Sequence, residues 1–425
     1  MRVIKALVLA LPAVGMTLGG VSSVIALNAA VVAPAYAADK VDKSKQVGVK
    51  VGKPLQEVLK LAQAKQFKEA MAKLKEVQAI PDQTPFEKFK VNEIVAYVAF
   101  NMGDTKTATK AYEEILDSGQ LTPEDFKKRL DQLMKVEYSA HNYDKAITLG
   151  NRYLKEVGPS MDAAVIVAQS YYLKKDYLHA IPATQMLIQL AEKSGQPVQK
   201  AWLDLLRSSQ QLAGKDDAAA QTLEVLLQKY PAPEYWRDMF IIEQNKGSNS
   251  DRKNLEVLRL KMLTGVLKPG DYMDMAQLAL ATGFPGDAKM ILEKGFADKV
   301  LGSGKGADRE KRLLAKAQAD SAADEKQLPS YEKDAMKQSS GDDEIKLGEA
   351  YISYGDYEKG IAAINRGFKK GGKLKAADEG HLALGIAYYD VKQNAKAAAQ
   401  FKAIAKDSKL ASVAHLWLIF LSSQK

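Results

Sequence analysis

Along most of the chain, apolar side chains recur at the spacing of an amphipathic helix, and one arrangement of them returns many times. In each copy an aromatic or small residue is followed three positions later by a small residue and then, four further on, by another residue that is usually apolar, as in Tyr357, Gly360 and Ile364. Copies begin at residues 67, 105, 143, 177 and 216, in steps of 38, 38, 34 and 39 residues, and again at 285, 357 and 394. This spacing places the side chains on one face of a helix, where the small residue lets a second helix approach closely.

A second amphipathic helix precedes each of these helices, and a short polar turn separates the two. Leu384, Gly385 and Tyr388 lie on one such helix, before the turn at Lys392-Gln393. Glycine or a polar residue in these turns is typical of a position where a helix ends. The repeating unit is therefore a helical hairpin of about 34 residues, and we predict an all-α solenoid of about ten such hairpins. The apolar segment Ala411–Ser423 is expected to be a terminal helix that caps the last hairpin.

The repeats resemble those of the tetratricopeptide-repeat (TPR) family. The residues at the signature positions of the family are Leu347, Gly348, Tyr351, Tyr357, Gly360 and Ile364 in one repeat and Leu384, Gly385, Tyr388, Ala397 and Phe401 in the next. The resemblance is specific in these two repeats, more degenerate elsewhere, and covers almost all of residues 55–404. It implies a TPR-type α-solenoid whose inner groove, lined by the first helix of each hairpin, binds other proteins.

The strength of the pattern divides the chain into segments. Residues 55–234 are expected to form an N-terminal TPR solenoid, and residues 235–301 to continue it with hairpins that include a longer turn. Residues 302–340 begin with the glycine-rich run 302–306 and carry only a weak pattern, which predicts either a weak helical hairpin or a hinge. Residues 341–425 are expected to form the C-terminal pair of repeats with the capping helix.

The first residues of the chain are typical of an export signal. Arg2 and Lys5 precede a long apolar stretch that ends in the small-x-small sequence Ala35-Tyr36-Ala37, and no acidic residue occurs before Asp39. We therefore predict that residues 1–37 are a signal peptide cleaved after Ala37, and that the mature protein is periplasmic. Residues 38–54 are expected to be a flexible leader. The alternative is an uncleaved membrane anchor, because the apolar stretch is long enough to cross a bilayer.

Composition and motifs give no indication of catalysis. The chain has no cysteine and only four histidines, none of which has a second ligand at the spacing of a metal site. The glycine-rich run at 302–306 lacks both the leading glycine and the Lys-Ser/Thr ending of a phosphate-binding loop. The formal net charge of +9 is spread over lysines interspersed with acidic residues, so no nucleic-acid site is expected. We therefore expect a protein that is not an enzyme and that holds no cofactor or metal.

The TPR resemblance assigns candidate partner-binding positions to the first helices of several hairpins. They are Glu93, Tyr97, Phe100, Asn101, Gln169, Tyr172, Glu349, Ile352, Tyr389 and Asp390. Aromatic side chains flanked by polar groups suit the recognition of an extended peptide or a helix, although any of these residues could instead pack against an adjacent hairpin. Some TPR co-chaperones clamp a terminal carboxylate with Lys and Asn, but Leu55, Leu59 and Glu93 stand at those places.

Fragments of the C-terminal half are similar to exported TPR proteins that accompany the TonB, ExbB and ExbD energy-transduction systems of Gram-negative bacteria. These fragments include Tyr235-Trp236, residues 367–374 and the closing Leu416-Trp417-Leu418. The resemblance implies a periplasmic scaffold that serves TonB-dependent outer-membrane transport. Two alternatives remain open: a TPR scaffold for envelope polysaccharide or secretion assembly and, in another class, a glycan-acting hydrolase that uses groove carboxylates.

Overall fold

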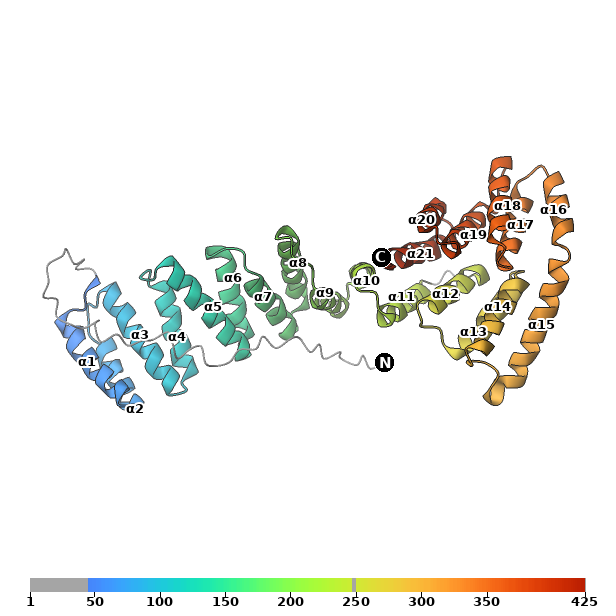
Figure 1. The fold of residues 1–425 in the computed structure, drawn as a ribbon. Coiled ribbons are helices and arrows are strands. Elements are labelled where there is room, and N and C mark those ends of the chain that lie inside the picture. The colour runs from blue at the N-terminus through green and yellow to red at the C-terminus, as the bar shows by residue number, and fades with distance from the viewer. Residues whose placement is uncertain (1–44, 247–249, 425) are drawn as a thin grey trace. The chain divides into compact units, whose positions relative to one another are not determined.

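The computed structural model describes residues 45–246 and 250–424, and this part of the chain is all-α. It contains 21 α-helices and one turn of 3-10 helix (η4, Gly304–Gly306), and no strand occurs within these residues (Figure 1). Successive helices pack as hairpins, so the predicted α-solenoid with a C-terminal capping helix is confirmed. The predicted signal peptide, residues 1–37, and the first residues of the predicted leader lie outside the described residues.

Contacts divide the chain into two compact units, Met1–Gly214 and Lys215–Lys425, a division that falls within the segment predicted as one solenoid. The described helices of the N-terminal unit are α1 (Val49–Gln63), α2 (Phe67–Gln78), α3 (Pro85–Asn101), α4 (Thr105–Asp117), α5 (Pro123–Ser139), α6 (Tyr143–Glu156), α7 (Met161–Leu173), α8 (Tyr177–Lys193) and α9 (Lys200–Leu212). The hairpins are α1/α2, α3/α4, α5/α6 and α7/α8, and the first helices α5 and α7 each contact the next first helix, α7 and α9.

Each hairpin turn of the N-terminal unit holds one residue in the left-handed backbone conformation, two positions before the second helix begins. These residues are Lys65, Gly103, His141 and Lys175, with φ between 58° and 74°. In the α5/α6 turn, the N–H of His141 donates to the carbonyl of Tyr138 and the N–H of Asn142 to that of Glu137. Such bonds satisfy the last carbonyls of the first helix and end it at a fixed place.

The prediction that residues 38–54 form a flexible leader is wrong from residue 49 onwards, because α1 begins at Val49. Val51, Leu55 and Val58 recur at helical spacing and are at most 2% exposed, so the helix is held by a buried apolar face. The residue before the helix is also fixed, since the N–H of Gly48 donates to Oε1 of Glu87 over 2.8 Å.

The C-terminal unit is closed by its last helix. Its described helices are α10 (Asp216–Lys229), α11 (Pro233–Asn245), α12 (Asp251–Leu263), α13 (Pro269–Ala281), α14 (Pro285–Ala297), α15 (Ala307–Glu325), α16 (Leu328–Lys337), α17 (Asp342–Ser353), α18 (Tyr357–Lys370), α19 (Ala377–Asp390), α20 (Asn394–Ala403) and α21 (Ala411–Ser423). The capping helix α21 covers α20 and also packs against α10 and α12, so the last helix of the unit contacts the first. The indole of Trp417, which is fully buried, stacks on Phe401 of α20 with ring centroids 5.2 Å apart.

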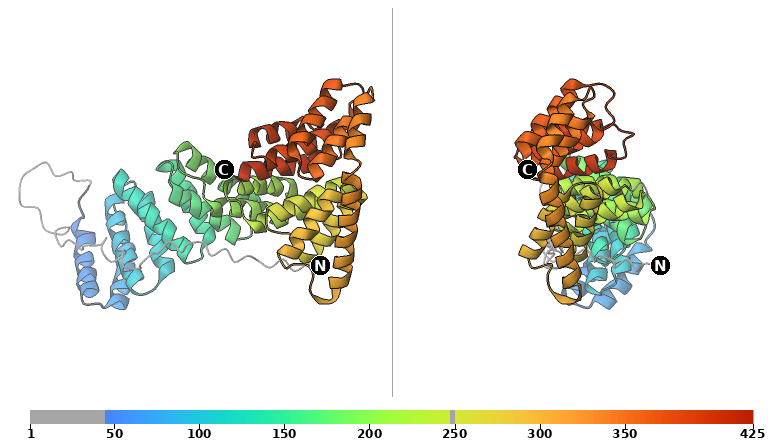
Figure 2. Two further views of the ribbon diagram at one scale, coloured as in Figure 1. Left: turned by 45° about the vertical axis from the view of Figure 1, so that its right-hand side comes forward. Right: turned by 90° about the vertical axis from the view of Figure 1, so that its right-hand side faces the viewer.

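Residues 302–340, for which the weak pattern predicted either a helical hairpin or a hinge, do not form a hairpin. Helix α15 packs on α14 and α16 packs on α17, whereas α15 and α16 hardly touch and follow each other end to end (Figures 1 and 2). Lys326 and Gln327 between them keep near-helical backbone angles. Pro329, at the start of α16, has no N–H and therefore interrupts the helical hydrogen bonds. The segment is one interrupted helix that joins the α13/α14 hairpin to the α17/α18 hairpin.

Helices α17 and α18 approach each other more closely than ordinary side chains would allow, and glycines make the contact. A Cβ atom on Gly348 would lie 2.4 Å from Cγ1 of Ile364. At one end of the pair, a Cβ atom on Gly341 would lie 1.9 Å from the carbonyl oxygen of Gly367. The small residues of the repeat are therefore required by helix packing at these positions.

Candidate partner-binding face

Four first helices of the N-terminal unit, α3, α5, α7 and α9, carry a row of aromatic and polar side chains that are half-buried or exposed. We call this row the first-helix face; its residues are Glu93, Tyr97, Phe100, Tyr138, Gln169, Tyr172 and Ser208. Tyr138 Oη donates to Oε1 of Gln169 over 2.7 Å, and Tyr172 Oη lies 2.9 Å from Oγ of Ser208. Each of these hydrogen bonds links one first helix to the next, so the face is held in a fixed arrangement.

The repeat explains why these hydrogen bonds recur. Tyr138 and Tyr172 both lie five residues before the start of the following helix in the sequence, and Gln169 and Ser208 both lie eight residues before it. In α3 the position five residues before α4 is Phe100, which has no hydroxyl group and is 43% exposed. The ring of Phe100 is therefore presented to solvent, where it can meet a partner.

Six of the predicted binding residues lie in this unit: Glu93, Tyr97, Phe100, Asn101, Gln169 and Tyr172. Glu93 is held by Arg129 of α5, with Nη2 2.6 Å from Oε1. Tyr97 packs edge-on against Phe67 of α2, with ring centroids 6.3 Å apart. The exposed Asn101 turns back to its own helix, because its Nδ2 donates to the carbonyl of Tyr97 over 2.8 Å. The six residues thus lie on two first helices, α3 and α7, with the α5/α6 hairpin between them, and most of them also stabilise the unit itself.

The charges around the first-helix face balance one another. Four cations, Lys90, Arg129, Lys135 and Lys200, are ion-paired with four anions, Glu93, Asp131, Asp162 and Asp204. Lys135 of α5 joins two helices, since its Nζ lies 3.0 Å from a carboxylate oxygen of both Asp131 and Asp162. These charges therefore cancel one another in pairs, and the exposed aromatic ring of Phe100 is not part of any of the pairs.

A pocket of about 520 Å³ lies beside this face, and sequence reasoning missed it. Its lining comes from α4, α5, the α5/α6 turn and α6, with Lys174 from the next hairpin: Thr105, Lys106, Thr109, Val136, Glu137, Ala140, His141, Asn142, Tyr143, Asp144, Lys145 and Lys174. The carboxylate of Glu137, a residue only 1% exposed, accepts hydrogen bonds from Thr109 Oγ1 (2.6 Å) and Asn142 Nδ2 (2.8 Å). The pocket forms between hairpins, so no spacing within one repeat predicts it.

In the C-terminal unit the predicted residues face other helices of the same unit. Glu349, only 9% exposed, lies with Oε1 3.2 Å from Nη2 of Arg252 on α12. Tyr389 packs against the rings of Trp417 and Phe420 on α21, with both centroids 5.5 Å away. Helices α12 and α21 therefore occupy the positions where the TPR resemblance places an open groove.

The other two predicted residues of this unit, Ile352 and Asp390, are also engaged. Ile352 packs closely against Gly360: a Cβ atom on Gly360 would lie only 2.5 Å from Cγ1 of Ile352. Asp390 accepts a hydrogen bond from Tyr357 and lies near Arg259 of α12. These side chains hold the unit together and do not line a free groove.

The buried charges around α12 include more carboxylates than arginines. Arg259 lies 3.1 Å from Glu256 and 2.7 Å from Asp287. Burial raises the pKa of Glu349, with Arg252 and Lys346 opposing the change and Glu379 and Glu256 adding to it. Burial also raises the pKa of Asp390 against the opposing charge of Arg259, and burial beside Asp390 raises the pKa of Tyr357 to about 12. Burial thus makes ionisation of Glu349 and of Asp390 less favourable in the folded chain.

We expect Glu349→Gln to change the pH dependence of stability. A carboxyl whose folded-state pKa is raised binds its proton more tightly in the folded chain, so ionisation at higher pH costs stability. Relative to wild type, the variant should therefore gain melting temperature on going from about pH 5 to about pH 8. Thermal unfolding followed by circular dichroism at several pH values measures this. An equal offset at every pH would show that Glu349 ionises without cost.

The described residues show no constellation suited to metal chemistry. No group of three or more His, Cys, Asp or Glu side chains there could hold a metal ion. The histidines contact separate partners: His141 with Tyr143, His179 with Asp176, His381 with Gln400 and His415 with Glu224. Among the described helices, none is both long and apolar enough to span a bilayer.

Comparison with known proteins gives neighbours of the same repeat type. No protein-family model matches this sequence, and no curated protein sequence matches it. Solved structures that align with it include a tetratricopeptide repeat protein from Parabacteroides merdae (11% identity, 88% of this chain and 99% of the other, TM-score 0.25). The C-terminal part of a TPR protein from Cytophaga hutchinsonii aligns at 16% identity over 66% of this chain and 98% of the other (TM-score 0.25).

A third neighbour is the TPR domain of P58(IPK), at 13% identity over 89% of this chain and all of the other (TM-score 0.21). At such TM-scores the folds do not superpose as wholes, so the class is defined by the chain's own succession of hairpins and left-handed turns. On that basis the protein is a TPR-like α-solenoid.

Proposed function

We propose that this protein is a non-enzymatic scaffold that binds a protein partner through the first-helix face of its N-terminal unit. The observation that carries the proposal is the row of aromatic and polar side chains on consecutive first helices, positioned by the Tyr138–Gln169 and Tyr172–Ser208 hydrogen bonds. Rigid aromatic side chains lose little conformational freedom on binding, which makes them effective anchors at interfaces.

Two exposed apolar side chains lie on the same first helices, α3 and α7. Phe100 is 43% exposed, and Leu173, the residue after Tyr172 at the end of α7, is 41% exposed. Contact of large apolar side chains with water is unfavourable, so a partner that buries these side chains gains binding free energy. The balanced charges nearby predict that binding depends weakly on ionic strength.

A narrower form of the proposal names the compartment and the assembly. We propose that the protein acts in the periplasm as an accessory component of TonB-dependent outer-membrane transport. The support comes from the sequence alone: the export-type residues 1–37 and the similarity of the C-terminal fragments to TPR proteins that accompany TonB, ExbB and ExbD.

Affinity isolation of the full-length protein from envelope extracts, with partners identified by mass spectrometry, tests both forms. We expect the variant Phe100→Ala/Leu173→Ala to bind the partner with an affinity about tenfold or more lower than that of wild type, because two apolar anchors are removed. The matched control is Leu178→Ala/Met186→Ala, which removes two exposed apolar side chains from the second helix α8. Recovery of TonB, ExbB, ExbD or an outer-membrane receptor would support the narrower form.

Two results would contradict these proposals separately. If the control variant loses as much binding as Phe100→Ala/Leu173→Ala, the first-helix face is not the binding site. If the partner belongs to an unrelated assembly, the role in TonB-dependent transport is wrong while the scaffold function stands.

A further inference from the structure

Helix α16 covers a surface on α17 and α18 with very little apolar contact of its own. Only Leu328 and Ala335 of its ten residues are buried. They pack against Leu347, Tyr351 and Ala363 of the α17/α18 hairpin. The thirteen-residue helix α12 of the same unit, by contrast, buries six side chains. Helix α17, on which α16 packs, buries seven of its twelve residues, so burial holds α16 less firmly than α17.

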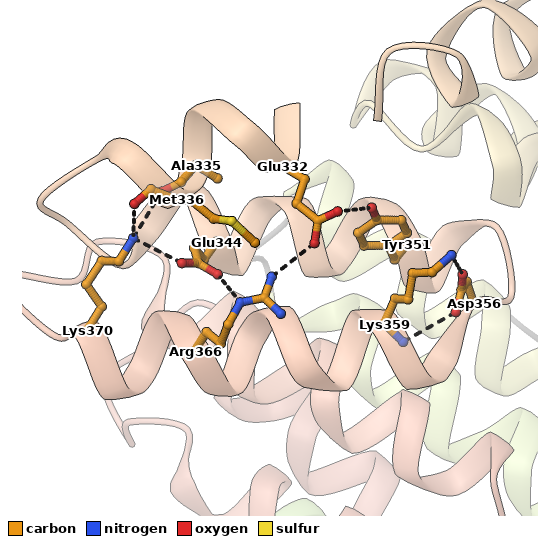
Figure 3. A network of polar contacts seen from close by, with 9 residues as sticks. All are labelled: Glu332, Ala335, Met336, Glu344, Tyr351, Asp356, Lys359, Arg366 and Lys370. Atoms are coloured by element: carbon orange, nitrogen blue, oxygen red, sulfur yellow. Dashed lines mark hydrogen bonds and ion pairs between the residues drawn. The ribbon is translucent and has the colours of Figure 1, made fainter. Parts of the chain in front are cut away.

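Polar contacts supply most of the attachment of α16 (Figure 3). Glu332 accepts a hydrogen bond from Tyr351 Oη over 3.2 Å, and its other oxygen lies 3.4 Å from Nη2 of Arg366. Lys370 Nζ donates to the carbonyls of Ala335 (3.0 Å) and Met336 (3.3 Å), which are in the last turn of α16. A cation at this place is favourable because it meets the negative end of the helix dipole.

The two cations on α18 are held in place independently of α16. The buried carboxylate of Glu344 on α17 lies 2.7 Å from Arg366 Nε and 3.0 Å from Lys370 Nζ (Figure 3). A helix that binds this surface can therefore pair an acidic side chain with Arg366 and its C-terminal carbonyls with Lys370, both of which are already held in position. Preorganisation of this kind lowers the cost of binding.

Both ends of α16 are points where the segment can separate from its neighbours. Helix α15 makes hardly any contact with α16, and Pro329 interrupts the hydrogen bonds between them. At the other end, Gln338 is extended, with ψ 147°, and Gln338, Ser339 and Ser340 lead to α17. Local opening of α16 would thus leave the packing of α15 on α14 unchanged.

We propose that the surface formed by Leu347, Tyr351, Ala363, Arg366 and Lys370 is a docking site for an amphipathic helix of a partner protein, and that α16 occupies it in the free chain. The chemistry of α16 specifies the partner: an apolar residue, an acidic residue four positions later and a small apolar residue three positions after that. In α16 these are Leu328, Glu332 and Ala335, which share one helical face. This site lies in the C-terminal unit and does not depend on the first-helix face.

Hydrogen exchange of the full-length protein tests whether α16 opens. We expect its amides to exchange about tenfold or more faster than those of α17 and α18, because local opening exposes them. Glu332→Gln should accelerate exchange in α16 by about two- to fivefold, since it removes a half-exposed ion pair. The control Glu358→Gln, which neutralises an exposed carboxylate on α18, should leave α16 unchanged. Equal protection of α16 and α17 would overturn the proposal.

A peptide experiment tests the docking site itself. Residues 327–339 are replaced by a Gly-Ser segment of equal length, and a labelled peptide of residues 326–340 is titrated onto this variant and onto wild type. We expect binding to the replacement variant to be at least about tenfold tighter and to weaken when the peptide carries Glu332→Lys. Equal binding to both proteins, or binding to neither, would overturn the proposal; if the replacement prevents folding, the exchange experiment decides alone.

Discussion

The variant Gly341→Ala is expected to lose roughly 2–3 kcal/mol of stability, because the added methyl group overpacks the contact between α17 and α18. The backbone of Gly341, with φ −76° and ψ −7°, suits any residue, so conformation is not the obstacle. The obstacle is the carbonyl oxygen of Gly367, which would lie 1.9 Å from the new Cβ atom. Because that oxygen belongs to the backbone of α18, the two helices must separate to make room.

Urea unfolding of the full-length variants, followed by circular dichroism, measures this loss. The matched control is Gly270→Ala at the start of α13, where an added Cβ atom meets nothing within 4 Å. The control should be neutral or gain up to about 1 kcal/mol, because alanine restricts the unfolded chain. If Gly341→Ala proves as stable as Gly270→Ala, the close contact between α17 and α18 is wrong.

The second large effect concerns the buried ion pair between α11 and α12. Lys253 Nζ lies 2.7 Å from Oε1 of Glu243, and both side chains are 3% exposed. Burial raises the pKa of Glu243, but hydrogen bonds from Lys253 and from Ser412 of α21 outweigh it and hold the pKa below its ordinary value. We expect Lys253→Met to cost about 3–5 kcal/mol, because it leaves a buried carboxylate without its main cation.

The double variant Lys253→Met/Glu243→Gln separates charge from packing. With both charges removed, most of the lost stability should return, since no isolated buried charge remains. The same urea experiment serves for both variants. A double variant that is as unstable as Lys253→Met would show that the methylene chain of Lys253, and not its charge, is what the unit requires.

The repeat architecture could be predicted from the sequence because the spacing of apolar and small residues that defines a hairpin lies within that hairpin. The spacing of Tyr357, Gly360 and Ile364 encodes a local helix and a close neighbour, and the structure shows both. Where the pattern is weak, in residues 302–340, local signals could not tell a hairpin from an interrupted helix. That outcome depends on contacts of α15 with α14 and of α16 with α17, which no spacing rule contains.

The candidate site could be predicted only in part, for a similar reason. The TPR frame correctly located residues on first helices, as Tyr172 shows, but it could not indicate which grooves remain open. In the C-terminal unit, Arg252 of α12 reaches Glu349 and α21 covers Tyr389, because the unit folds back on itself. Such closure follows from how many hairpins are stacked and how they pack, and a single repeat carries no information about it.

The central claim is that a partner binds the first-helix face of the N-terminal unit, and photo-crosslinking tests it most directly. A photoreactive phenylalanine is placed at Phe100, at Leu173 or, as a control on the second helix α8, at Leu178, which is 65% exposed. After irradiation of cells that produce the full-length protein, we predict the same crosslinked partner from Phe100 and Leu173 and none from Leu178. Crosslinking to that partner from Leu178 but not from the other two positions would contradict the account.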